Sequence, residues 1–88
     1  MGSAAVLMYS TAWCPYCTRA RELLRDKGMT FTEIDVEMVP GSRDQMRART
    51  GRTSVPQIFV GDHHIGGYDE MRALELRGEL EPLLAAAC

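Results

Sequence analysis

Apolar and polar residues follow one another along this chain in patterns that predict strands and helices in turn. Residues 4–9 are nearly all apolar, which is typical of a strand buried on both faces. From Cys14 to Leu24 apolar side chains recur every three or four positions while charged residues take the other face, and Gly28 stands where a helix commonly ends. Residues 30–36 alternate and are rich in β-forming types. A strand, a helix and a strand in this order predict a right-handed βαβ unit with parallel strands.

A short polar helix is expected in the middle of the chain. Ser42 and Gln45 have the spacing of a capping box, which predicts a helix that begins at Ser42 and runs to Thr50. Most residues of this segment are polar, so Met46 is the side chain expected to anchor it to the core.

A hairpin and a helical segment are expected after this helix. Residues 57–60 form an apolar run, the pair Gly61-Asp62 is typical of a turn, and residues 63–65 return as the partner strand. Met71 and the leucines after it recur at helical spacing, with an interruption at Gly78. The elements follow the order βαβαββα with a short C-terminal helix, and we expect a single domain over residues 1–88.

The composition changes this picture little and excludes some classes of function. Hydrophobic residues make up 45% of the chain and charged residues 25%, as in an ordinary soluble globular domain. The formal net charge is −2 and no long run of like charge occurs, so we expect neither a nucleic-acid nor a membrane partner. The first residues carry no basic segment typical of a signal peptide, and we therefore expect a cytoplasmic protein.

The candidate chemistry lies in two cysteines. The chain has three cysteines, an odd number, and two of them form the motif Cys14-Pro15-Tyr16-Cys17, which favours redox or metal chemistry over a structural disulfide scaffold. If Cys14 caps the helix and Pro15 is its first residue, the Cys14 sulfur lies at the positive end of the helix dipole, where a thiolate is stabilised. Cys17 lies one turn further on the same face, close enough to form a disulfide with Cys14. Cys14 is therefore the candidate nucleophile and Cys17 the candidate resolving thiol.

A zinc site is the alternative interpretation of this cysteine pair. His63, His64 and Cys88 offer further ligands. Adjacent residues on a strand point to opposite faces, however, and structural zinc sites usually combine two closely spaced ligand pairs. A Cys-X-X-Cys pair beside a βαβ unit instead favours dithiol redox chemistry, so we expect no metal and interpret Cys88 as an unpaired thiol near the C-terminus.

Several segments of the chain match one family in order and spacing. They are Tyr9, residues 14–17, residues 51–60 with the pair Val55-Pro56, and residues 65–70 with the sequence Ile-Gly-Gly-Tyr-Asp-Glu. Together they resemble the glutaredoxin family, above all its bacterial dithiol members of the glutaredoxin 3 type. The resemblance implies an α/β, thioredoxin-like fold. Its four-stranded mixed sheet would have the strand order 2-1-3-4, with strands 1 and 2 parallel, and would be flanked by helices.

The resemblance also implies a glutathione site around the two cysteines. The peptide bond before Pro56 is implied to be cis, and the backbone of Val55 to pair with the cysteinyl part of glutathione as an added strand would. Tyr68 and Asp69 are implied to hold the γ-glutamyl end, because a helix N-terminus suits its carboxylate and an aspartate suits its ammonium group. The residues implied to bind glutathione are Thr11, Tyr16, Val55, Pro56, Gly67, Tyr68 and Asp69.

The chain departs from the family pattern at two positions near the motif. The family commonly has a lysine three residues before the nucleophilic cysteine, where it meets the glycyl carboxylate, and this chain has Thr11. Arg43 and Arg52 are the candidates to supply the missing positive charge. Trp13 is reminiscent of thioredoxins, although a thioredoxin has Gly-Pro between its cysteines.

The function that the resemblance implies is that of a dithiol glutaredoxin, a glutathione-dependent thiol–disulfide oxidoreductase. The Cys14 thiolate would attack protein disulfides or glutathionylated thiols, and Cys17 would resolve the mixed disulfide. Glutathione would serve as co-substrate and reduce the protein, and glutathione reductase would act indirectly by keeping glutathione reduced. We expect a monomer.

Two other functions stay open from the sequence. The first is a [2Fe–2S] carrier that holds its cluster with Cys14 from two subunits and with two glutathiones. Pro15 argues against this function, because in the family a rigid proline there generally accompanies redox activity. The second is a thioredoxin-like electron donor that is reduced by a flavoprotein reductase, which the absence of lysine at Thr11 keeps open.

Overall fold

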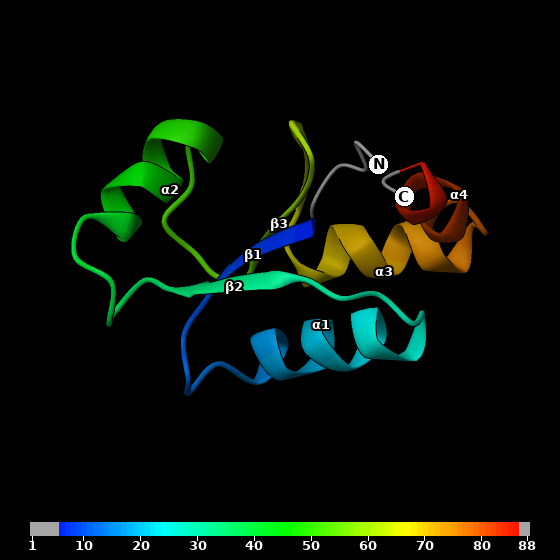
Figure 1. Cartoon of the computed structure of the whole chain (residues 1–88), viewed down its shortest axis with the longest axis horizontal. Coiled ribbons are helices and arrows are strands. Elements are labelled where there is room, and N and C mark those ends of the chain that lie inside the picture. The colour runs from blue at the N-terminus through cyan, green and yellow to red at the C-terminus, as the bar shows by residue number, and fades with distance from the viewer. Residues whose placement is uncertain (1–5, 87–88) are drawn as a thin grey trace.

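A four-stranded sheet lies at the centre of the molecule, with helices packed against it (Figure 1). The computed structural model describes residues 6–86. Its strands are β1 (Val6–Ser10), β2 (Thr32–Asp35), β3 (Gln57–Val60) and β4 (His63–Gly66). Its helices are α1 (Pro15–Asp26), α2 (Ser42–Thr50), α3 (Tyr68–Leu76) and α4 (Leu80–Ala85).

The strand order of the sheet is β2-β1-β3-β4. β1 and β2 are parallel, with Leu7 opposite Thr32, whereas β3 is antiparallel to both β1 and β4. These observations confirm the predicted βαβ unit and the predicted thioredoxin-like fold. Because β1 is an inner strand and leads directly to the start of α1, the fold places Cys14 at the carboxyl end of a central strand.

Two apolar clusters hold the helices on the sheet. In β1, Met8 belongs to the cluster packed by α1, α3 and α4, whereas its neighbour Tyr9 belongs to the cluster packed by α2. Leu24 of α1 and Met71 of α3 are fully buried in the first cluster, and Met46 of α2 is fully buried in the second. Figure 1 shows α2 set apart from the other three helices. Because neighbouring residues of β1 enter different clusters, this strand is apolar on both faces from Val6 to Tyr9.

α2 covers Ser42–Thr50 as predicted, but the cap at its start differs from the prediction. The N-cap is Gly41, whose φ of 78° is a left-handed conformation that glycine adopts without steric cost. The Ser42 hydroxyl donates to the Val39 carbonyl at 2.6 Å, and the side-chain oxygen of Gln45 accepts the Tyr9 hydroxyl at 2.7 Å. The predicted capping box of Ser42 and Gln45 is therefore wrong, because Gln45 has a partner in the sheet that local spacing does not reveal.

The element boundaries shift by a few residues. β2 covers Thr32–Asp35 where residues 30–36 were predicted, and β1 extends to Ser10. Ala4 and Ala5 of the predicted first strand lie outside the described residues, as does Cys88. Between residues 6 and 86, no helix has both the length and the apolar character needed to cross a membrane.

Candidate active site

Cys14 lies at the N-terminus of α1, as predicted. It is the N-cap residue, with extended backbone angles (φ −90°, ψ 116°), and Pro15 is the first residue of the helix. The Cys14 sulfur accepts the backbone N–H of Cys17 at 3.4 Å. An N–H donor and the positive end of the helix dipole therefore both face this sulfur. The sequence places the sulfur there because proline needs no hydrogen-bond acceptor at the first helical position.

Cys17 is the buried member of the pair. Its side chain has no exposed surface, whereas Cys14 is half-buried. Burial raises the pKa of the Cys17 thiol to about 12, and a hydrogen bond from the Thr11 backbone opposes that rise. This asymmetry suits Cys14 for the first attack on an external disulfide and Cys17 for a later step inside the protein.

The loop before β3 lies directly against Cys14. The peptide bond between Val55 and Pro56 is cis, which confirms the prediction made from the family resemblance. The carbonyl oxygen of Val55 accepts the Cys14 thiol at a sulfur–oxygen distance of 3.6 Å. Gln57 holds this loop from the sheet side, because its side-chain nitrogen donates to the Ser54 carbonyl at 3.0 Å. The backbone of Val55 is thereby fixed beside the reactive sulfur.

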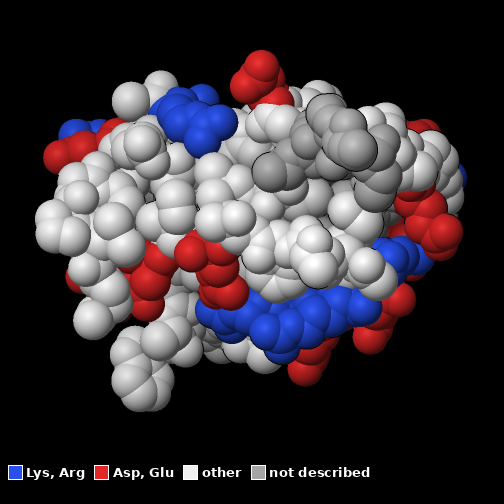
Figure 2. Space-filling view, in the orientation of Figure 1, with Lys and Arg blue, Asp and Glu red and all other residues white. Residues whose placement is uncertain are grey.

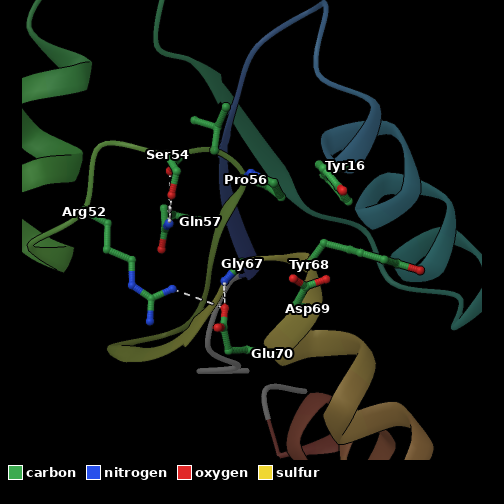
Figure 3. A pocket seen from close by; sticks show the side chains of 10 residues that line it. Tyr16, Arg52, Ser54, Pro56, Gln57, Gly67, Tyr68, Asp69 and Glu70 are labelled. Carbon is green, nitrogen blue, oxygen red and sulfur yellow. Dashed lines mark hydrogen bonds and ion pairs between the residues drawn. The ribbon is translucent and has the colours of Figure 1, made fainter.

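A groove of about 210 Å³ lies between this loop, α1 and the start of α3. Figure 3 shows Tyr16 on one side of the groove and Arg52 and Ser54 on the opposite side, with the first residues of α3 between them. The groove is lined by Tyr16, Arg52, Ser54, Val55, Pro56, Gln57, Gly67, Tyr68, Asp69 and Glu70. The structure therefore brings together six of the seven residues that the resemblance implied to bind glutathione.

The two tyrosines form one end of the groove. The ring centroids of Tyr16 and Tyr68 are 6.4 Å apart, and the guanidinium of Arg19 lies 5.4 Å from the centroid of the Tyr16 ring. Asp69 is exposed at the second position of α3, and the N-cap of this helix is Gly67. The Asp69 side chain is therefore not used to cap this helix.

Thr11 is the predicted site residue that does not line the groove. It is buried behind the two cysteines, where its carbonyl accepts a hydrogen bond from Arg21 at 3.2 Å. Of the two arginines considered as replacements for the missing lysine, Arg52 lines the groove, whereas Arg43 donates to the Thr53 carbonyl at 3.2 Å. Arg52 is therefore the cation that the structure places in the groove.

Glu70 is a groove residue that sequence reasoning missed. One of its carboxylate oxygens accepts the N–H of Gly67 at 2.6 Å and also contacts the Arg52 guanidinium at 3.2 Å (Figure 3). The hydrogen bond from Gly67 is the main reason that the pKa of this carboxyl is lowered; burial opposes it, and the Arg52 contact lowers the pKa further. Glu70 thus anchors Arg52 at the groove. The spacing Gly67-X-X-Glu70, which has the form of a capping box with glycine as N-cap, is the signal that could have revealed it.

The two glycines before α3 stand at positions where a larger side chain would crowd neighbouring atoms. Gly66 has a φ of 118°, and an added Cβ there would lie 2.6 Å from a Glu70 carboxylate oxygen. An added Cβ at Gly67 would lie 3.3 Å from the Pro56 carbonyl oxygen. Gly67 therefore allows the start of α3 to approach the cis-proline loop closely, and Gly66 leaves room for the Glu70 side chain.

Gly66→Ala tests the room that this glycine leaves for Glu70. We expect it to lower the free energy of unfolding by about 1–3 kcal/mol, because alanine is strained at a positive φ. It should also weaken binding of glutathione by several-fold, since the displaced Glu70 no longer anchors Arg52. Denaturant unfolding and isothermal calorimetry with glutathione measure the two effects. Gly78→Ala is the control: its φ is 71° with no atom within 4 Å of the added Cβ, so it should lose stability and keep its affinity.

The two histidines considered as zinc ligands lie in different environments. His63 is exposed at the start of β4, whereas His64 stacks on Phe59 with ring centroids 4.9 Å apart. The Nε2 atom of His64 lies 2.7 Å from the side-chain oxygen of Gln57. Within residues 6–86, no three side chains of metal-binding type are grouped around a common point.

The sequence of this chain is similar to that of known glutaredoxins. The family model named Glutaredoxin matches residues 6–65. Over 81 residues the chain is 48% identical to a glutaredoxin of Pseudomonas aeruginosa, which covers 92% of this chain and 96% of the relative. It is also 48% identical over 81 residues to glutaredoxin 3 of Escherichia coli K12, with 92% of this chain and 98% of the relative covered.

Solved structures agree with these relatives. The solution structure of a glutaredoxin from Brucella melitensis has a TM-score of 0.85 and 43% identity, covering 100% of this chain and 96% of that one. The crystal structure of a buckwheat glutaredoxin–glutathione complex has a TM-score of 0.89 and 27% identity, covering 98% and 81%. With its two cysteines, its cis-proline loop and its groove arranged as described above, the chain belongs to the glutaredoxin family.

Proposed function

We propose that this protein is a glutathione-dependent thiol–disulfide oxidoreductase of the dithiol class. The observation that carries the proposal is the position of the Cys14 sulfur. It lies half-buried at the N-terminus of α1, 3.4 Å from the Cys17 backbone nitrogen and 3.6 Å from the carbonyl oxygen of Val55, a residue that lines the groove. A nucleophilic sulfur beside an extended backbone segment suits attack on a disulfide that a short peptide carries.

The groove offers a complement to each charged group of glutathione. The backbone of Val55 can pair with the cysteinyl unit, which would place the glutathione sulfur near Cys14. Asp69 suits the ammonium group, and the first N–H groups of α3 suit the neighbouring carboxylate. Arg52 can meet the glycyl carboxylate from the opposite side of the groove. The solved buckwheat glutaredoxin–glutathione complex, which has the same fold, supports this choice of ligand.

The chemistry proceeds by exchange of sulfur partners without an external oxidant. The Cys14 thiolate attacks the disulfide of a glutathionylated protein, forms a Cys14–glutathione disulfide and releases the protein thiolate. A second glutathione thiolate then attacks that disulfide, so that oxidised glutathione leaves and the Cys14 thiolate returns. With a protein disulfide, Cys17 instead attacks the mixed disulfide at Cys14 and expels the second protein thiolate. Two glutathiones then reduce the Cys14–Cys17 disulfide.

The choice of reductant tests the proposal. We expect turnover of bis(2-hydroxyethyl) disulfide when NADPH, glutathione and glutathione reductase are supplied, because the groove is built for a tripeptide. We expect little turnover, roughly a tenth or less, when thioredoxin reductase replaces glutathione and its reductase. NADPH oxidation at 340 nm measures both rates. Equal or faster reduction by thioredoxin reductase would contradict the proposal and favour a thioredoxin-like electron donor.

A further inference from the structure

The burial of Cys17 raises a chemical difficulty for the resolving step. Only a thiolate attacks a disulfide, and burial raises the pKa of the Cys17 thiol far above neutral pH, so little of it is ionised. Cys17 also has no exposed surface, so water cannot stabilise the thiolate as it forms. Groups of the protein must supply that stabilisation.

Arg21 lies where it can do so. It follows Cys17 by four residues on α1 and therefore lies on the same face of the helix. Its side chain is 18% exposed, and its Nη2 atom donates to the Thr11 carbonyl at 3.2 Å. The Thr11 backbone in turn hydrogen-bonds the Cys17 thiol. A continuous chain of contacts thus leads from the guanidinium through one peptide segment to the buried sulfur.

The guanidinium is itself anchored from the sheet. The Nε atom of Arg21 donates to a Glu33 carboxylate oxygen on β2 at 2.6 Å, and that oxygen also accepts the Ser10 hydroxyl at 2.6 Å. The hydrogen bond to Glu33 raises the pKa of Arg21, with smaller contributions from Cys17 and Cys14. Arg21 is therefore a fixed cation and not a mobile surface side chain. The charged and titratable groups acting on Cys17 are Cys14 and Arg21 on its own helix, and Glu33 lies behind Arg21.

We propose that Arg21 is a positioning residue for Cys17, holding the Thr11 backbone against the thiol and supplying positive charge as the Cys17 thiolate forms. The proposal rests on the dithiol mechanism described above and concerns one of its steps. In that step the Cys17 thiolate attacks the Cys14 sulfur of the mixed disulfide, and the old disulfide bond breaks. Its electron pair leaves with the partner's sulfur. We place the main effect of Arg21 at this step, because the attack of Cys14 on a substrate does not require the Cys17 thiolate.

A double-mutant cycle separates this role from a merely structural one. It compares the wild type, R21Q, C17S and the double variant R21Q/C17S. In single-turnover reactions with a protein disulfide, R21Q should slow formation of the Cys14–Cys17 disulfide about tenfold at neutral pH, the effect of one pKa unit on the thiolate. The rate should keep rising to higher pH than in the wild type. In the C17S background R21Q should change deglutathionylation of a small peptide less than about twofold.

Matched variants complete the test. Figure 2 shows basic side chains gathered along α1 on the face in view, so another arginine of this helix provides a control of equal charge change. Arg25→Gln, an exposed position one turn beyond Arg21, should leave the resolving rate unchanged, and Arg21→Lys should restore part of it by keeping the charge. If R21Q does not fold, Glu33→Gln replaces it in the cycle, since it removes the anchor and retains the guanidinium.

Two results would overturn the role of Arg21. The first is a loss of deglutathionylation on adding R21Q to C17S that is as large as the loss of the resolving rate on adding R21Q to the wild type. The second is an equal loss of the resolving rate in Arg25→Gln. A wild-type protein inactive with glutathione would instead contradict the proposed function, whatever Arg21 does.

Discussion

Cys14→Ser should reduce the turnover of a glutathionylated peptide and of a protein disulfide to the uncatalysed background, a loss on the order of 10³-fold or more. Both reactions begin with attack by the Cys14 sulfur, and a serine hydroxyl is not ionised at neutral pH. The serine oxygen can still accept the Cys17 N–H at the start of α1, so the helix keeps its cap and the fold should persist. The glutathione-coupled oxidation of NADPH measures the loss of activity, and thermal unfolding checks the fold.

The control for this variant lies three residues away. Cys17→Ser makes the same chemical change at the buried sulfur, so a comparison of the two separates loss of the nucleophile from loss of any thiol. Measurable deglutathionylation by Cys14→Ser would show that Cys17 can attack an external substrate. That result would contradict the roles inferred from the exposure of the two sulfurs.

The secondary structure and the position of the nucleophile were predictable from local sequence. The spacing of apolar residues in α1 and the pair Cys14-Pro15 depend on contacts within one or two helical turns. The nearly uniform apolar character of β1 predicted a strand buried on both faces, and the structure confirms this with one apolar cluster on each face. The strand order and the cis bond before Pro56 came from the family resemblance, because neither follows from periodicity.

The interactions that complete the site were not predictable, because each joins residues far apart in the sequence. Arg52 meets Glu70 across 18 positions, and Arg21 meets Glu33 across 12. At Thr11 the resemblance pointed to a ligand-binding side chain, but the structure uses the backbone of this residue to contact Cys17 and Arg21. Any residue type can provide a backbone carbonyl or N–H group. The identity of residue 11 therefore could not show whether its backbone or its side chain contributes to the site.

Cys17→Ser should separate the two branches of the proposed mechanism. We expect deglutathionylation of a small glutathione mixed disulfide to persist within a few-fold of the wild type, since that route uses only Cys14 and free glutathione. Reduction of a protein disulfide such as insulin should fall at least about tenfold. Without Cys17, the mixed disulfide between Cys14 and the substrate protein must be cleaved by glutathione from solution. In the wild type a neighbouring thiol one helical turn away attacks it.

The buried position of Cys17 calls for a second variant beside the serine one. A serine hydroxyl at a site with no exposed surface needs a hydrogen-bond partner, and an unsatisfied one costs about 1–3 kcal/mol of stability. Cys17→Ala removes the thiol without adding a polar group, so agreement between the two variants assigns the kinetic effect to the missing sulfur. If both were as inactive as Cys14→Ser with the small mixed disulfide, the monothiol branch would be wrong. Cys17, and with it Arg21, would then be required in every catalytic cycle.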